Sequence, residues 1–371
     1  MDRLRELLSD RRVQIGLGVV LVAIVIAAVA LAGGGEDEPA STSTTTVAPT
    51  TSTTAESTTT TTVLETTTTV AEAGPPSPLN GMPVEDATLL DRRVIAVKVD
   101  NHPNARPQSG VEQADAVWEL LVEGGLTRFI ALFHHTDVDY VGPIRSGRPT
   151  DPDLVAITGG PLTRSGAQDW VQAIFNRKGV NTIGEVRPAT FRMGHRQAPH
   201  NLYGDTTLMR EFADGQGWPD EAPTAPLFVW GDWDGGDAAE EIVFDWSDEQ
   251  VDVTWKFQGG RYLRFTGTNA HTWTNRDRDV QEQVEADTLV VLEAPRYTAC
   301  PSGSGSCVPA METVGEGRAL VFHGGEVVEG RWSRGAYDVP FALSAADGSP
   351  LTVPPGRMWI NVFPAGRSID W

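Results

Sequence analysis

The sequence predicts a single N-terminal transmembrane helix followed, outside the cytoplasm, by an α/β (α+β) domain and then a smaller, mostly-β domain. One unbroken apolar run follows a short basic N-terminus. Up to about residue 226, strand-like apolar runs alternate with helical patterns, and beyond it short strand-like segments dominate between Gly, Asp and Asn turns. The part from residue 79 onward is long enough for two ordinary domains, each with its own core. We therefore expect domains at 79–226 and 227–371.

The apolar run at residues 13–32 contains no charge, and as a helix its roughly 20 residues would span a hydrocarbon core of about 30 Å. A cleaved signal peptide is the alternative, because Ala30-Leu31-Ala32 fits the small-x-small cleavage pattern, but secretory apolar segments usually measure about 7 to 15 residues. Basic residues precede the run and acidic residues follow it, so the positive-inside bias keeps residues 1–12 in the cytoplasm. We expect a single-pass protein of the cell membrane, with the bulk of the chain extracytoplasmic.

Residues 33–78 are rich in Ser and Thr, and the stretch from Ser41 to Glu72 has no aromatic residue and no amphipathic period from which a core could form. We expect a disordered stalk that is an inert spacer rather than a binding motif. A flexible coil of about 45 residues would reach roughly 40 Å, which would hold the globular part clear of the bilayer.

The formal net charge of −21 argues against a general nucleic-acid or anionic-lipid binder, since a phosphate backbone repels an acidic surface. A local basic site remains compatible with this charge. The two cysteines, Cys300 and Cys307, are expected to form a disulfide in an exported domain. A zinc site would need two further ligands, and the segment between the cysteines has neither His nor acidic residues. We expect no metal and no cofactor.

A buried strand is predicted over residues 94–100, because apolar residues occupy both of its faces. It ends in Asp100-Asn101-His102, and the loop that follows contains Arg106 and too much Pro to continue a strand or a helix. Ligands of open α/β sheets usually bind at the carboxyl ends of the strands, so these four polar residues are candidate ligand-binding residues. The alternative is that Asp100 and Asn101 brace a turn.

A β-hairpin is predicted next, with strands in 113–123 and 127–135 joined at Gly124-Gly125. Glu119 and Glu123 share one face of the first strand, where two carboxylates are costly unless they are exposed or paired. We expect Arg128 to be their ion-pair partner and include it among the candidate ligand-binding residues. An acid and base pair formed by the two glutamates is the alternative.

The sharpest candidates for an anion site are Arg145 and Arg148, which bracket Ser146, because a guanidinium binds a carboxylate or phosphate through two parallel hydrogen bonds. Asp151 or Asp153 is expected to begin a helix whose N-terminus would add to the same positive field. Ser146 belongs to this candidate site. We do not favour it as a nucleophile, because no Gly-x-Ser-x-Gly motif surrounds it.

Two further helices are predicted in the first domain. One spans residues 165–175, has an apolar stripe that would pack on the sheet, and has Ser165 as its N-cap. The other begins at the cap Asp205 and continues through Phe212.

The loop between these helices gathers two histidines and two arginines. His200 and Asn201 are candidate ligand-binding residues, and hydrogen bonding to an acidic ligand suits this composition. Metal binding by His195 and His200 is the alternative, but the five-residue spacing comes without a clear third ligand. Asp100 and His200 are also the candidate acid and base if the protein is an enzyme.

Strand character in the second domain appears at residues 241–246, 251–257, 262–266, 288–293, 318–322 and 359–363. This half also carries tryptophans that either pack in the core, which we favour, or form a sugar-stacking platform. They are Trp246, Trp255, Trp273, Trp332 and Trp359.

The motifs VKVDNHPNARPQSG, ADAVWELLVEGGLTRF, VGPIRSGRP and APHNLY together resemble the YerB-type envelope lipoproteins, a bacterial domain family of unknown function. The second half is similar to the smaller C-terminal domain of that family, through GEGRALVFH, GRWS, Asp347-Gly348 and PGRMWI. The resemblance covers nearly all of the chain from residue 79 and implies an exported, membrane-tethered protein without naming a reaction. The chain departs from the lipoprotein pattern, because no Cys lies near the apolar run and a transmembrane helix must replace the lipid anchor.

Two function classes follow. We favour a non-catalytic envelope protein that binds an anionic cell-wall group through Arg106, Arg145 and Arg148. The alternative is an envelope hydrolase or transferase that acts on glycan or lipid-linked phosphate, with the same arginines stabilising developing charge. The expected partners are the membrane, through the N-terminal helix, and an anionic wall ligand or an envelope protein, but no nucleic acid.

Overall fold

The computed structural model describes residues 74–371, which lie within one compact unit, residues 69–371. The predicted cytoplasmic tail, the transmembrane helix at 13–32 and nearly all of the stalk lie outside the described residues. Among residues 74–371, no helix is both long and apolar enough to cross a membrane.

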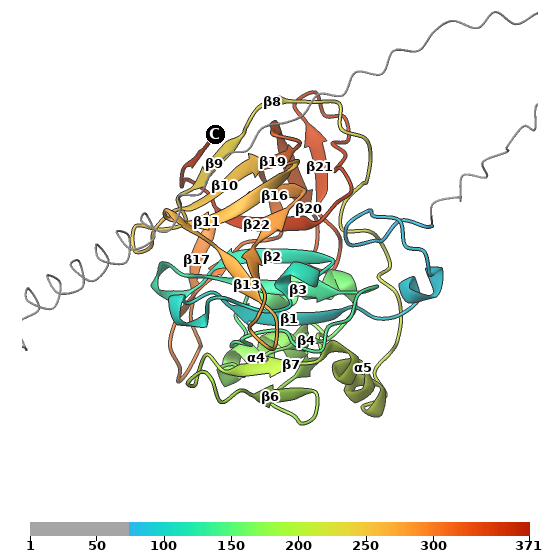
Figure 1. Cartoon of the computed structure of the whole chain (residues 1–371), viewed down its shortest axis with the longest axis vertical. Coiled ribbons are helices and arrows are strands. Elements are labelled where there is room, and N and C mark those ends of the chain that lie inside the picture. The colour runs from blue at the N-terminus through green and yellow to red at the C-terminus, as the bar shows by residue number, and fades with distance from the viewer. Residues whose placement is uncertain (1–73) are drawn as a thin grey trace, which may run out of the picture. The chain divides into compact units, whose positions relative to one another are not determined.

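The centre of the fold is a mixed eleven-stranded sheet with strand order β21-β20-β19-β16-β22-β2-β3-β1-β4-β5, and β8 pairs with β20 at its side (Figure 1). Its N-terminal strands are β1 (Ile95–Asp100), β2 (Ala116–Leu121), β3 (Thr127–Phe133), β4 (Leu162–Thr163) and β5 (Thr182–Ile183). Its later strands are β8 (Asp237–Ala238), β16 (Thr288–Ala294), β19 (Gly315–His323), β20 (Glu326–Arg334), β21 (Ala342–Ala345) and β22 (Met358–Pro364).

The two halves of the chain meet inside this sheet. β22 pairs in parallel with β16 on one side and with β2 on the other, so the penultimate strand of the chain is inserted beside the second. The predicted boundary at residue 226 therefore separates segments of sequence that share one sheet. In Figure 1 the N-terminal strands β1, β2 and β3 lie beside the orange and red C-terminal strands.

The strand and hairpin predictions around β1 are confirmed. On β1, Ile95, Val97 and Val99 enter one apolar cluster and Ala96 enters the other, because alternate side chains point to opposite faces of a sheet. β2 and β3 pair antiparallel around the turn at Gly124, whose φ of 67° is the left-handed conformation that glycine adopts readily. Both faces of the sheet are thus covered.

A six-stranded antiparallel sheet packs on the first of these faces. Its order is β12-β11-β10-β9-β23, with β15 paired to β11. The strands are β9 (Glu241–Phe244), β10 (Val253–Gln258), β11 (Arg261–Thr266), β12 (Asn269–Ala270), β15 (Glu285–Ala286) and β23 (Ile369–Asp370). The strand predictions for the second domain correspond to β9, β10, β11, β16, β19 and β22 and are confirmed.

The helices α3 (Asp151–Val155) and α4 (Asp169–Arg177) contribute to the apolar cluster on the opposite face, and α5 (Thr206–Gly215) contributes Met209 to the first cluster. Asp205 caps α5 by accepting from the Leu208 N–H, as predicted. The prediction of Ser165 as an N-cap is wrong, since α4 begins after Gln168. The Ser165 N–H instead donates to the Arg145 carbonyl, which keeps this segment extended.

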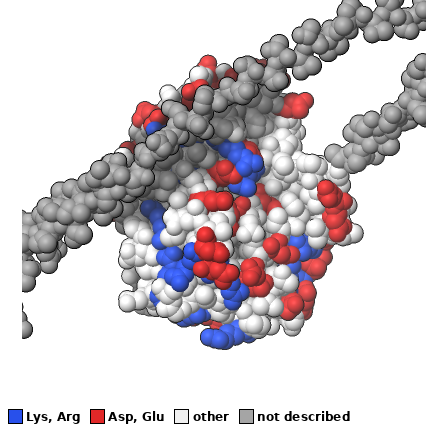
Figure 2. Space-filling model, viewed as in Figure 1, with Lys and Arg blue, Asp and Glu red and all other residues white. Residues whose placement is uncertain are grey.

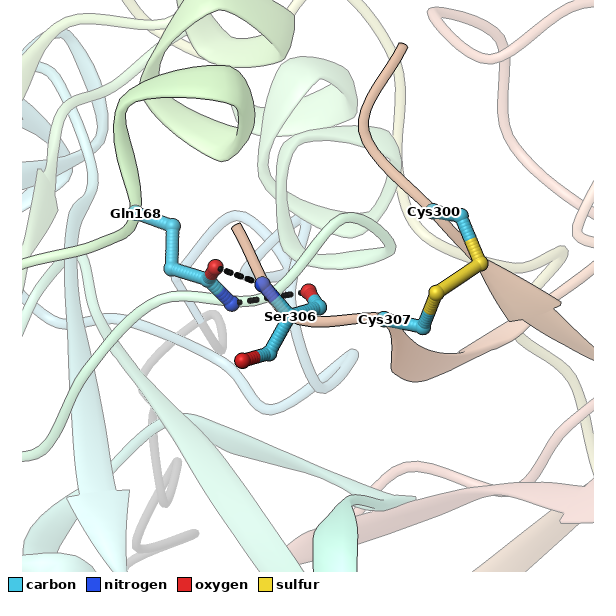
Figure 3. The surroundings of a disulfide bond; sticks show 4 residues. All are labelled: Gln168, Cys300, Ser306 and Cys307. Carbon is cyan, nitrogen blue, oxygen red and sulfur yellow. Dashed lines mark hydrogen bonds between the residues drawn. A yellow bond between two sulfur atoms is a disulfide. The ribbon is translucent and has the colours of Figure 1, made fainter. Parts of the chain in front are cut away.

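Three hairpins complete the described fold: β6 (Thr190–Arg192) with β7 (Leu202–Gly204), β13 (Thr272–Thr274) with β14 (Gln281–Gln283), and β17 (Arg296–Ala299) with β18 (Val308–Met311). The predicted disulfide Cys300–Cys307 closes the last of them. Figure 3 shows the Gln168 side chain bonded to both the N–H and the carbonyl of Ser306, so the bridged loop is attached to the start of α4.

The tryptophans of the second half belong to the core. Trp246, Trp255, Trp332 and Trp359 are all at most 3% exposed, and Trp273 is half-buried against the first apolar cluster. Core packing, the preferred interpretation of these side chains, is therefore confirmed, and they form no exposed stacking platform.

Candidate functional site: a histidine, aspartate and arginine cluster at the end of β1

The carboxyl end of β1 brings together three of the sequence-predicted side chains. Oδ2 of Asp100 lies 2.8 Å from Nδ1 of His200 and 3.2 Å from Nε of Arg145. These residues come from three separate segments, up to 100 positions apart in the sequence. We refer to them as the Asp100 cluster.

Backbone hydrogen bonds place the cluster. The Asp100 N–H donates to the Pro143 carbonyl and the Arg145 N–H donates to the Lys98 carbonyl, so the segment that carries Arg145 runs beside the end of β1. Oδ1 of Asp100 accepts from the His102 N–H, which is the turn-bracing contact typical of Asp. Asp100 therefore braces a turn with one oxygen and meets His200 and Arg145 with the other.

A second histidine lies against the first. The rings of His102 and His200 stack with centroids 4.7 Å apart and planes 21° apart. Nδ1 of His102 accepts from the Asn104 N–H, so the neutral ring carries its proton on Nε2. Burial, followed by the nearby His200, lowers the pKa of His102 and favours this neutral form. Nδ1 of His200 donates to Asp100, because a carboxylate oxygen can only accept.

Arg145 is the member of the cluster with free hydrogen-bonding capacity. Its side chain is 25% exposed, and its Nε faces Asp100. Among residues 74–371, neither terminal nitrogen of its guanidinium has a protein acceptor within hydrogen-bonding distance. Both Nη groups are therefore available to a ligand, in the planar arrangement that binds a carboxylate or phosphate.

Arg128 lies beside this guanidinium. Its Nη1 donates to the Ser146 carbonyl at 2.8 Å, and burial lowers its pKa to about 10, so it remains a cation at neutral pH. The Ser146 hydroxyl lies 3.4 Å from the Ser165 hydroxyl. Among the described residues Ser146 has no histidine or carboxylate partner, so it lacks the base that would activate it as a nucleophile.

The expected pairing of Arg128 with the two glutamates is wrong. Glu119 pairs with Arg264 at 2.6 Å, and Glu123 pairs with Arg148 through both carboxylate oxygens, each at 2.7 Å. The strand register explains the error. Residue 129 lies opposite Glu119, so Arg128, one residue earlier, points to the other face of the sheet.

Arg148 and Asn201 act as structural braces in this structure. The guanidinium of Arg148 is engaged by Glu123, and its N–H donates to Asp151 Oδ2 at 2.7 Å. Asp151 does begin α3, as expected, but its side chain is buried against Nζ of Lys98 at 2.7 Å. Asn201 accepts from Arg192 and so holds the loop that carries His200.

Beneath the cluster lies a closed ring of hydrogen bonds among buried side chains. Its members, in order, are Asn101, Thr127, Glu119, Arg264, His271 and Gln108. All six are at most 6% exposed. Asn101, Gln108, Glu119 and Thr127 belong to the N-terminal half, whereas Arg264 lies in β11 and His271 follows β12, so the ring joins the two halves.

Charge fixes the direction of every hydrogen bond in this ring. Arg264 can only donate, so it donates to Glu119 and to Nδ1 of His271. Nε2 of His271 must then carry the proton and donates to Oε1 of Gln108 at 2.8 Å. Nε2 of Gln108 in turn donates to Oδ1 of Asn101 and to the Asp100 carbonyl. The ring thereby holds both residues at the end of β1 in one orientation.

Arg106 connects the ring to the surface. Its Nε donates to Oδ1 of Asn101 and its Nη2 to the Asn101 carbonyl. Burial lowers its pKa to about 10. A cavity of about 60 Å³ borders Asn101, Arg106 and Thr127, and a neighbouring cavity of about 310 Å³ also borders Arg106. Arg106 is therefore a cation that is held by Asn101 and also borders both cavities.

The surroundings of the cluster carry more positive than negative charge. The charged groups here are the cations Lys98, Arg106, Arg128, Arg145, Arg148 and Arg264 and the carboxylates of Asp100, Glu119, Glu123 and Asp151. The six cations exceed the four carboxylates, although the chain as a whole has a formal net charge of −21. Figure 2 shows basic and acidic residues interspersed on the visible face of the described part.

Sequence reasoning missed the roles of Gln108, Arg264 and His271. Arg264 carried no usable signal, because the apolar Leu263 and Phe265 alternate with it in β11 and favour the opposite face as the buried one. That Arg264 is buried, on the same face as Tyr262, is decided by the structure. His271 lies outside any strand and carried no signal either.

Comparisons with known proteins agree with this architecture. The family models "Protein of unknown function (DUF3048) N-terminal domain" and "Protein of unknown function (DUF3048) C-terminal domain" match residues 79–219 and 241–360. The protein named "Putative lipoprotein YerB" of Bacillus subtilis (strain 168) is 28% identical over 301 residues, which cover 78% of this chain and 86% of that protein. The crystal structure of YerB from Bacillus subtilis matches with a TM-score of 0.69 and 25% identity, over 80% of this chain and 99% of the solved chain. With both domains matched in order, this chain belongs to the DUF3048 family of proteins of unknown function.

Proposed function

We propose that this protein is a membrane-anchored component of the cell envelope that binds an anionic cell-wall or envelope ligand at the Asp100 cluster. Envelope association is supported by the relative that is named a lipoprotein. The anchor in this chain would be the uncharged run at residues 13–32, with the stalk presenting residues 79–371 outside the cytoplasm.

One observation carries the choice of an anion. Nε of Arg145 lies 3.2 Å from Oδ2 of Asp100 in an ion pair without a hydrogen bond, and neither terminal nitrogen has a protein acceptor among the described residues. The ion pair restrains the guanidinium, so less freedom is lost when it binds a carboxylate or phosphate oxygen pair. The nearby Arg128 and the local excess of cations add to the attraction.

A thermal-shift screen of residues 69–371 against phosphorylated and carboxylated wall fragments tests the proposal. This part of the chain forms one compact unit. Binding to the folded state alone raises the unfolding temperature. The stabilising ligand should lose its effect in Arg145→Ala and keep it in Arg367→Ala, whose side chain is also 25% exposed and also ion-paired. Equal losses in both variants would refute a site at Arg145.

An envelope hydrolase or transferase is the second candidate function, and the pair of His200 with Asp100 favours it. A carboxylate that accepts from Nδ1 fixes the ring and leaves Nε2 as a base, the arrangement used by many acid and base catalysts. Asp100→Asn separates the candidates. In an enzyme it abolishes turnover of glycan or lipid-linked phosphate and retains binding, whereas a binding protein shows no turnover in either form.

A further inference from the structure

The balance of charge around the Asp100 cluster points to the kind of anion that the cluster suits. Each of the four carboxylates here has one cation as its ion-pair partner. The pairs are Asp100 with Arg145, Glu119 with Arg264, Glu123 with Arg148, and Asp151 with Lys98. Within the described part of the chain, Arg106 donates to Asn101 and Arg128 to the Ser146 carbonyl, and neither pairs with a carboxylate. The excess of two positive charges therefore belongs to Arg106 and Arg128.

Arg128 lies on the same face of the central sheet as Asp100. The two residues are directly opposite each other in the antiparallel pair of β1 and β3, so their side chains leave the sheet on the same side. Nη1 of Arg128 donates to the carbonyl of Ser146, the residue after Arg145. Arg128 is only 8% exposed, so water and salt screen its charge weakly. An anion held by Arg145 thus lies in the field of a second cation.

Arg106 is close to the same end of β1, because its Nη2 donates to the carbonyl of Asn101, the residue after Asp100. Burial, followed by the charge of Arg264, lowers the pKa of Arg106. Burial, followed by the charge of Arg148, lowers the pKa of Arg128. In both cases the neighbouring charge with the largest effect is another cation, as expected of guanidinium groups without a carboxylate partner.

The stacked histidines do not cancel this excess. Nδ1 of His102 accepts from the Asn104 N–H, which fixes the neutral form of that ring. Nδ1 of His200 donates to Asp100, so a further proton on this ring would only add positive charge. Histidines change charge mainly between pH 5 and 8, so at pH 8 the excess is that of the two arginines.

We propose, on the basis of the function proposed above, that the group bound at the Asp100 cluster is a dianion of the phosphate monoester type. A carboxylate or a phosphodiester carries one negative charge, whereas a phosphate monoester carries nearly two at neutral pH. Two oxygens of the monoester meet the terminal nitrogens of Arg145, which have no protein acceptor among the described residues. Its two charges match the two unpaired cations, and a monoanion would leave one of them unmatched.

Isothermal titration of residues 69–371 at pH 8 and low ionic strength tests this proposal by comparing methyl phosphate with methyl sulfate. Each ion has one methyl group and three terminal oxygens, but at pH 8 methyl phosphate has two negative charges and methyl sulfate has one. The second charge should strengthen binding by about tenfold, as for unit charges roughly 6 Å apart at an effective dielectric constant of about 40. Arg145→Ala should abolish the binding of both ions.

Arg128→Gln should reduce the ratio of the two affinities to about threefold or less, because it removes one of the two unpaired charges. Arg331→Gln is the matched control. It removes the same charge from an exposed ion pair in β20, on the other side of the central sheet, and should leave the ratio within about twofold of its original value. Glucose 6-phosphate and vesicles that contain phosphatidic acid then show whether the group comes from a sugar phosphate or from a lipid headgroup.

Equal affinities for methyl phosphate and methyl sulfate would overturn this inference and leave the anion site of the proposed function intact. Binding of neither ion would overturn both. Equal decreases of the ratio in Arg128→Gln and Arg331→Gln would also overturn it, since the preference for a dianion would then not arise at Arg128. The comparison of the two ions in the unsubstituted protein decides the test if Arg128→Gln fails to fold.

Discussion

Replacing Glu119 by Gln should strongly destabilise the folded state. Glu119 is fully buried, and its partners are the Thr127 hydroxyl, Nη2 of Arg264 and Nε1 of Trp359. All three partners donate, whereas the glutamine amide offers one acceptor oxygen and one donor nitrogen. In every orientation a donor would face a donor.

The magnitude follows from burial. Arg264 is 0% exposed, and Glu119→Gln would remove its neutralising charge. Breaking a buried ion pair in this way typically costs about 3 to 5 kcal/mol. We therefore expect the free energy of unfolding of residues 69–371 to fall by about 3 to 5 kcal/mol at pH 7.

Urea unfolding followed by circular dichroism measures this change. Glu316→Gln is the control, because its ion pair with Arg331 is exposed and should be worth less than about 1 kcal/mol. Glu119→Gln and Arg264→Met combined should cost at least about 1 kcal/mol less than the sum of the single changes, since the second removes the stranded charge. A cost of Glu119→Gln below about 1 kcal/mol, or additive effects, would refute the buried pair.

Three further outcomes are expected. Burial lowers the pKa of His134 to about 4, so between pH 6.5 and 4 the unfolded chain binds more protons at this residue than the folded chain does. Acidification through this window should therefore lower the free energy of unfolding by up to about 3 kcal/mol. His134→Gln should lessen that loss, and an unchanged urea midpoint profile would contradict the assignment. Serine at both Cys300 and Cys307, seven positions apart, should lower the free energy of unfolding by about 2 kcal/mol, and no change in the urea midpoint would contradict a closed loop. Arg148→Ala should lower the free energy of unfolding by about 1 kcal/mol, because it removes the ion pair with Glu123. It should weaken anion binding less than Arg145→Ala does, since Glu123 already engages the Arg148 guanidinium. Equal weakening by the two variants would mean that Arg148 also binds the ligand.

The sequence by itself determined the features that depend on neighbouring residues. Alternation of apolar residues located β1, the glycine pair located the turn between β2 and β3, and Asp205 located the start of α5. The sequence also located the polar residues at the end of β1, because a polar segment that directly follows an apolar strand can be recognised from about ten consecutive residues. The resemblance to the YerB-type family rests on the same local motifs, and the family models confirm it.

Only the tertiary structure decided which partner each buried charge takes. Glu119 pairs with Arg264, which lies 145 positions away in the sequence. It does not pair with Arg128, only nine positions away, because the strand register places Arg128 on the other face of the sheet. Asp100 met His200 because the loop before β7 folds back over β1. A sequence offers many arginines and histidines of equal chemistry, and their distances from a given carboxylate are fixed by sheet order and packing, which connect β2 to β22 across most of the chain.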